Sequence, residues 1–69
     1  MDDELERRIL DWLRYHPYLT DWQLEYILGL NRGSMKLYST LKRMKSEGKI
    51  YGERVNKRIV VTSRGMNNG

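Results

Sequence analysis

Cysteine is absent from this chain of 69 residues, and histidine and proline each occur once. Without cysteine the chain forms no disulfide and offers no thiolate to a metal ion. His16 is a single imidazole, whereas a zinc site needs three or four protein ligands. We therefore expect no metal and no cofactor. Small folds often add a disulfide, a metal or a partner subunit for stability, so the first two absences favour a homodimer.

Long apolar runs are also missing, and none approaches the ~20 residues that a membrane span requires. The chain starts with the acidic stretch MDDELERR, which is unlike the basic start of a secretory signal peptide. We expect a soluble cytoplasmic protein with no membrane partner.

Catalytic motifs are lacking as well. The sequence contains neither the G-x-x-x-x-G-K-[ST] loop of phosphate-binding enzymes nor the G-x-G-x-x-G run of dinucleotide-binding folds. The acids gather at the start of a predicted helix, where they serve the helix dipole, and His16 has no cysteine partner. We expect that the protein is not an enzyme and has no evident small-molecule site.

Charge is segregated along the chain. Residues 1–29 hold seven acids and three bases, a net charge of −4, while residues 30–69 hold two acids and ten bases, a net charge of +8. The two halves together give the formal net charge of +4. A half-chain this basic is typical of a protein that binds a polyanion.

Apolar spacing and capping residues predict three helices. Leu5, Ile9, Trp12 and Leu13 form one helical stripe, and Pro17 ends a helix over about 3–15. Thr20 and Gln23 form a capping-box pattern for a helix over about 21–28, which Gly29 ends. Ser34 is a suitable N-cap for a basic helix over about 35–47. A short helix, a turn with glycine and a longer basic helix make a helix-turn-helix pattern.

The remaining chain has β character. Residues 49–62 contain two short stretches with β-branched side chains separated by a turn near Asn56, which predicts a hairpin. Residues 63–69 are polar and predict a frayed tail. The expected fold class is α+β, a single domain over 1–69 with a three-helix bundle followed by a two-stranded hairpin. An alternative is that a short extended segment at Tyr18 and Leu19 also pairs with the hairpin.

Three stretches of the chain carry a family resemblance. LTDWQLEYILGL resembles the entry of a regulator helix-turn-helix, LKRMKSEGKI the end of a recognition helix, and RIVVTSRG the second strand of a wing and its exit. In this order they resemble the winged helix-turn-helix domain of MarR-like regulators and their archaeal relatives. The turn before the third helix, Asn31 to Ser34, is longer than is usual in that family.

This resemblance implies a protein that binds double-stranded DNA and regulates transcription, with the third helix in the major groove. Lys36, Ser39 and Arg43 are then candidates for base contacts, and Met35 for contact with a thymine methyl. We expect Arg32 and Lys42 at phosphates, with Ser34 offering both a cap and a backbone amide to phosphate. In the hairpin, Arg54, Asn56, Lys57 and Arg58 would lie along the backbone or in the minor groove.

Large apolar side chains remain outside the predicted core. Trp22 and Tyr26 fall on the outer face of the second helix, and Leu10 lies away from the stripe of the first. With Tyr15 they are candidates for a homodimer interface. Alternative functions are a protein–protein interaction module and a DNA-binding factor in plasmid or viral replication or partition. Tyr38 and Tyr51 are expected to pack, and for each the alternative is a hydroxyl donated to a phosphate.

Overall fold

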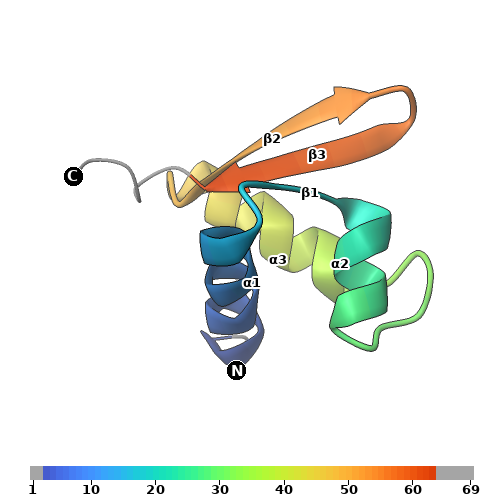
Figure 1. The fold of residues 1–69 in the computed structure, drawn as a ribbon, viewed down its shortest axis with the longest axis horizontal. Helices are drawn as coiled ribbons and strands as arrows, with labels where there is room; N and C mark the ends of the chain where they lie inside the picture. The colour runs from blue at the N-terminus through green and yellow to red at the C-terminus, as the bar shows by residue number, and fades with distance from the viewer. Residues whose placement is uncertain (1–2, 64–69) are drawn as a thin grey trace.

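The order of helices and strands follows the expectation closely. The computed structural model describes residues 3–63, and Figure 1 shows their path. The elements are α1 (Asp3–Tyr15), β1 (Tyr18–Thr20), α2 (Asp21–Ile27), α3 (Met35–Ser46), β2 (Ile50–Val55) and β3 (Arg58–Ser63). The predicted end residues Leu28 and Glu47 are the C-caps of α2 and α3 rather than their last helical residues.

Local capping interactions set where α2 begins and ends. The Gln23 amide donates to Thr20 Oγ1 at 3.2 Å, and the Thr20 amide donates to Gln23 Oε1 at 2.9 Å. These two bonds form the predicted capping box. Gly29, at φ 72°, follows the C-cap in the left-handed conformation that glycine adopts without strain.

The sheet has three antiparallel strands in the order β1-β3-β2, so the expectation of a two-stranded sheet is wrong. Leu19 of β1 pairs with Val61 of β3, and both side chains are buried. A strand of three residues is too short for the alternation of polar and apolar residues to reveal it. The segment at Tyr18 and Leu19 is the third strand.

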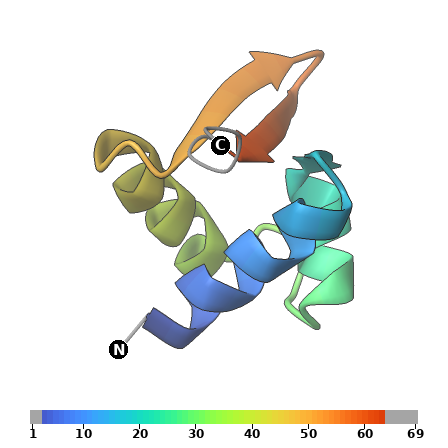
Figure 2. The same cartoon turned by 60° about the vertical axis from the view of Figure 1, so that its left-hand side comes forward.

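A two-residue turn joins β2 to β3. Asn56 (φ 52°) and Lys57 (φ 66°) both have positive φ, which is the type I′ geometry that suits the twist of a hairpin. Val55 pairs with Arg58 immediately before and after the turn. The predicted turn at Asn56 is therefore confirmed, and the hairpin projects beyond the helices (Figures 1 and 2).

The core lies where the helices meet one face of the sheet. Every helix and strand supplies at least one buried apolar side chain. The most deeply buried are Ile9, Leu24, Leu37, Met44, Ile50 and Val61. This packing fixes the rotation of α3 about its own axis. No helix in the range 3–63 is long and apolar enough to cross a membrane. The predicted frayed tail lies outside the described residues except for Ser63, which belongs to β3.

Candidate nucleic-acid interface

The face of α3 opposite the core is exposed and polar, as the helical spacing predicts. Leu37 and Met44 are fully buried, while the other side of the helix exposes Met35, Lys36, Ser39, Lys42 and Ser46. The Met35 side chain is 78% exposed at the first turn. The Ser39 hydroxyl donates to the Lys36 carbonyl at 3.2 Å, so its oxygen remains available as an acceptor.

Arg43 occupies a different position from the rest of that face. Its Nη2 atom lies 3.5 Å from Glu6 Oε2 of α1, and its side chain is half-buried. The structure therefore places Arg43 at the edge of α3 that faces α1. The centre of the exposed face is left to Ser39, Lys42 and Ser46.

A groove between α3 and the hairpin collects three cationic side chains. Lys42 and Lys45 of α3 and Arg54 of β2 line it, above an apolar floor that includes Ile50 and Val61; we call it the cationic groove. It has a volume of about 290 Å³. Sequence reasoning missed Lys45 because a single-helix projection places it close to the core stripe. Only the packing of the hairpin beside α3 brings Lys45 and Arg54 to the same groove.

The loop between α2 and α3 is held by a buried carboxylate. Glu25 is only 3% exposed, and its Oε2 accepts from the Gly33 amide at 2.7 Å and the Ser34 amide at 3.3 Å. The Ser34 side chain in turn accepts from the Leu37 amide at 3.3 Å, which confirms Ser34 as the N-cap of α3. The Ser34 amide is therefore engaged by Glu25, contrary to the expectation that it is open to phosphate.

Sequence reasoning had used Glu25 only in the charge count. Its position three residues before Leu28 puts it on the buried side of α2. The sequence signal for this role is an acidic residue on an apolar helical stripe, followed by a loop that contains glycine. Which amides it reaches depends on the fold.

A second buried carboxylate joins α2 to α3. The Tyr38 hydroxyl donates to Asp21 Oδ2 at 2.7 Å, and Asp21 Oδ1 accepts from the Trp22 amide at 2.9 Å. The hydrogen bond to Asp21, together with burial, raises the pKa of Tyr38 from 10.0 to about 12. The hydroxyl of Tyr38 thus has an internal partner. The side chain of Tyr51 is 55% exposed in β2.

Trp22 lies against two arginines rather than alone on the surface. The Arg32 Cζ atom is 4.0 Å from the centroid of the Trp22 ring, and the Arg58 Cζ atom is 3.3 Å from it. Both distances are well within the range of cation–π contacts. The structure therefore joins one residue of the expected dimer interface to two of the expected DNA contacts. Arg54, Asn56 and Lys57 are exposed at the end of the hairpin.

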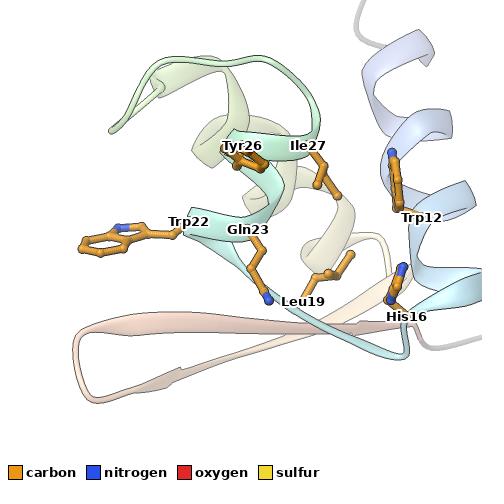
Figure 3. A pocket seen from close by; sticks show the side chains of 7 residues that line it. All are labelled: Trp12, His16, Leu19, Trp22, Gln23, Tyr26 and Ile27. Atoms are coloured by element: carbon orange, nitrogen blue, oxygen red, sulfur yellow. The ribbon is translucent and has the colours of Figure 1, made fainter.

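The four residues expected at a dimer interface do not share one hollow. Two of them, Trp22 and the 86% exposed Tyr26, line a hollow between α1 and α2, which we call the aromatic hollow. Its other lining residues include Trp12 and His16, whose rings stack at 5.7 Å (Figure 3). Leu10 packs partly against the core and lines a different hollow with Arg14 and Lys49. Tyr15 is 76% exposed at the end of α1.

Among residues 3–63, no group of three or more histidine, cysteine, aspartate or glutamate side chains has the arrangement to hold a metal ion. Comparisons with models of protein families, with curated proteins and with solved structures gave no match.

Proposed function

We propose that this protein is a winged helix-turn-helix domain that binds double-stranded DNA and regulates transcription. The observation that carries the proposal is the position of its cations. The exposed face of α3, the cationic groove and the end of the hairpin form adjoining basic surfaces. The order α1-β1-α2-α3-β2-β3 with sheet order β1-β3-β2 supports the same assignment, because a helix-turn-helix followed by a hairpin has the layout of that class.

In this proposal α3 enters the major groove. Lys36 and Ser39 contact base edges near the start of the helix, and the exposed Met35 packs against a thymine methyl. The expectation that Arg43 reads bases is replaced by a role at the rim, because its guanidinium is paired with Glu6. Its charge then contributes to attraction of the DNA backbone.

The hairpin supplies contacts to the flanking DNA. Arg54 and Lys42 share the cationic groove, where they hold the phosphate backbone beside α3. Lys57 and Asn56, at the exposed turn, reach the backbone or the minor groove. A homodimer would place two copies on half-sites about one helical turn apart, and binding to the chromosome would locate the protein in the cytoplasm with the nucleoid.

The test is fluorescence anisotropy with a labelled duplex of random sequence over a series of salt concentrations. The slope of log affinity against log salt is about −0.9 for each phosphate neutralised, so several contacts should give a slope of about −3 or steeper. We expect Arg54→Gln to make that slope shallower by about 0.9.

Arg14→Gln is the matched control, because it removes the same charge from the last turn of α1, outside the cationic groove. We expect it to leave the slope nearly unchanged. An absence of binding at low salt in the wild-type protein, or equal slopes for the two variants, would contradict the proposal.

A second candidate function is protein contact through the aromatic hollow between α1 and α2. The observation that favours it is the exposure of Tyr26 beside Trp12 and His16 (Figure 3). If the protein self-associates through this surface, sedimentation equilibrium should give the mass of a dimer. The Tyr26→Ser variant should then give a lower mass. A monomer mass for the wild-type protein at high concentration would exclude a homodimer through this surface.

A further inference from the structure

Three segments of the chain meet at the Trp22 ring. Trp22 belongs to the first turn of α2, Arg32 to the loop before α3, and Arg58 is the first residue of β3. The two guanidinium carbons lie 4.0 Å and 3.3 Å from the ring centroid. Trp22 also lines the aromatic hollow, and in Figure 3 its ring projects from α2 on the side away from Trp12 and His16. We call Arg32 and Arg58 the arginine pair.

Each of the three segments is held in place by a local structure. The capping box fixes the start of α2, and the carboxylate of Glu25 holds the loop after Arg32 through the Gly33 and Ser34 amides. The type I′ turn sets the position of Arg58. Cation–π contact in this setting restricts two long side chains that would otherwise sample many rotamers.

The arginine pair keeps its charge available. Across residues 3–63 no carboxylate forms an ion pair with Arg32 or Arg58. The two buried acids of α2 are engaged elsewhere, Asp21 by Tyr38 and Glu25 by backbone amides. An indole face attracts a cation without neutralising it, so two like charges are held at one ring, and neither forms an ion pair within residues 3–63. Such a pair is complementary to a ligand with more than one negative charge.

We propose that Trp22 is a positioning residue that orders Arg32 and Arg58 as a clamp for neighbouring phosphates of one DNA strand. This inference rests on the proposed DNA binding and adds a specific backbone contact to it. The clamp lies at the Trp22 ring, to which the α2–α3 loop contributes Arg32 and β3 contributes Arg58, and neither arginine lines the cationic groove of Lys42, Lys45 and Arg54. The protein would then contact the DNA backbone at two places, the cationic groove and the clamp. Two contacts fix how α3 is oriented in the major groove of the DNA. Trp22 then contributes to DNA binding without contacting a base.

The experiment compares Trp22→Leu with Trp22→Tyr, which keeps an aromatic face. We expect Trp22→Leu to weaken binding to the random duplex about two- to fivefold at low salt and to make the salt slope shallower by about one unit. The Trp22→Tyr protein should keep most of the wild-type affinity and most of the wild-type salt slope. Tyr18→Leu is the matched control, because Tyr18 is an exposed aromatic residue of β1 that takes part in neither arginine contact; it should leave both quantities unchanged.

A double-mutant cycle tests whether Trp22 acts through the arginines. Arg58→Gln should weaken binding in the wild-type background and have a smaller effect when Trp22 is already leucine. Additive losses would overturn the positioning role. Urea unfolding of each variant verifies that the protein is folded, and Trp22→Tyr keeps the comparison informative if the leucine variant is unstable.

A measurement without DNA separates this inference from the proposed function. In the free protein, the ring current of Trp22 should shift the side-chain proton resonances of Arg32 and Arg58 upfield, and Trp22→Leu should abolish that shift. Absence of the shift overturns the clamp even if DNA binds. A shift accompanied by no DNA binding in the wild-type protein instead overturns the proposed function. DNA binding with the same slope in Trp22→Leu overturns the clamp alone.

Discussion

At the scale of single residues, the carboxylates of α2 behave differently from those of an ordinary exposed helix. Asp21 and Glu25 are each 3% exposed, and both carboxylates accept hydrogen bonds from groups outside their own helix. A buried carboxylate is tolerated when such donors replace the water that it loses. These bonds hold α2, the loop and α3 in one arrangement.

We expect Tyr38→Phe to lower the free energy of unfolding by roughly 2 kcal/mol, because it removes a hydrogen bond to a charged group and leaves a buried oxygen of Asp21 without its donor. Urea denaturation at about pH 8 measures the loss. Thr20→Val, which removes the capping hydroxyl at the start of the same helix, is a useful comparison at roughly 1 kcal/mol. A Tyr38→Phe protein as stable as the wild type would show that the bond contributes little.

The hydrogen bond from Tyr38 to Asp21 predicts that the stability of the protein depends on pH. The pKa of Tyr38, about 12 in the folded protein, is above its ordinary value of 10.0, so the folded state holds this proton more tightly than the unfolded state does. The stability contributed by the bond is therefore complete below about pH 10 and is lost as the pH rises through about 12. The difference in free energy of unfolding between the wild type and Tyr38→Phe should therefore become smaller when unfolding is measured at higher pH. A constant difference would contradict the assignment.

At the scale of elements, the hairpin turn combines a favourable residue with an unfavourable one. A type I′ turn needs positive φ at both central positions, for which Asn followed by Gly is preferred. Here Lys57 occupies the second position at φ 66°, where a side chain with a Cβ atom costs about 1 kcal/mol. A cation at an exposed turn is thus kept at the expense of hairpin stability.

We expect Lys57→Gly to leave the protein as stable as the wild type or up to about 1 kcal/mol more stable, because relief of strain outweighs the flexibility of glycine in the unfolded chain. The same variant should bind the random duplex more weakly, with a salt slope shallower by about 0.9. Thermal unfolding and anisotropy measure the two effects on one protein. Asn56→Gly, which keeps the charge, is the control for the slope. Weaker binding that accompanies a loss of stability would contradict this account.

At the scale of the whole molecule, the acidic first half partly neutralises the basic second half. Glu6 of α1 lies 3.0 Å from Lys49 Nζ and 3.5 Å from Arg43 Nη2. Its hydrogen bond to Lys49 is the main cause that raises the pKa of that lysine, with a further contribution from Glu47. Glu6 therefore ties α1 to the end of α3 and the segment before β2, and it offsets positive charge there.

We expect Glu6→Gln to increase affinity for a random duplex about two- to fivefold at low salt, because it removes a negative charge that lies beside Arg43 and Lys49 and raises the net charge. Glu4→Gln changes the net charge equally without affecting these ion pairs and should have the smaller effect. Anisotropy at low and physiological salt measures both variants. Equal gains for the two would attribute the increase to net charge alone.

The elements were predictable from the sequence because their signals are local. Pro17 ends α1, Thr20 and Gln23 cap α2, and Ser34 caps α3 through bonds that span at most three residues. The rotation of α3 was predictable too, since the spacing of Leu37, Leu41 and Met44 identifies its buried side. The strand β1 was only an alternative, because three residues carry no clear period.

The candidate surface depends on contacts between residues far apart in the chain. Arg43 was expected to contact bases from the exposed face of α3, but its guanidinium pairs with Glu6, which lies 37 positions earlier in the chain. Trp22 was assigned to a dimer interface by its helical position, but the hairpin brings Arg58 against its ring. A projection of one helix contains no information on what the next element places beside it.

The sequence by itself determined the helices, the hairpin turn and the uneven charge, since these follow from capping, turn chemistry and composition over short stretches. Only the tertiary structure decided that Lys45 and Arg54 share a groove, that Glu25 and Asp21 are buried, and that Trp22 lies against two arginines. The physical reason is that side-chain electrostatics and packing act through space. The fold determines which charges meet, and the order of residues along the chain does not reveal it.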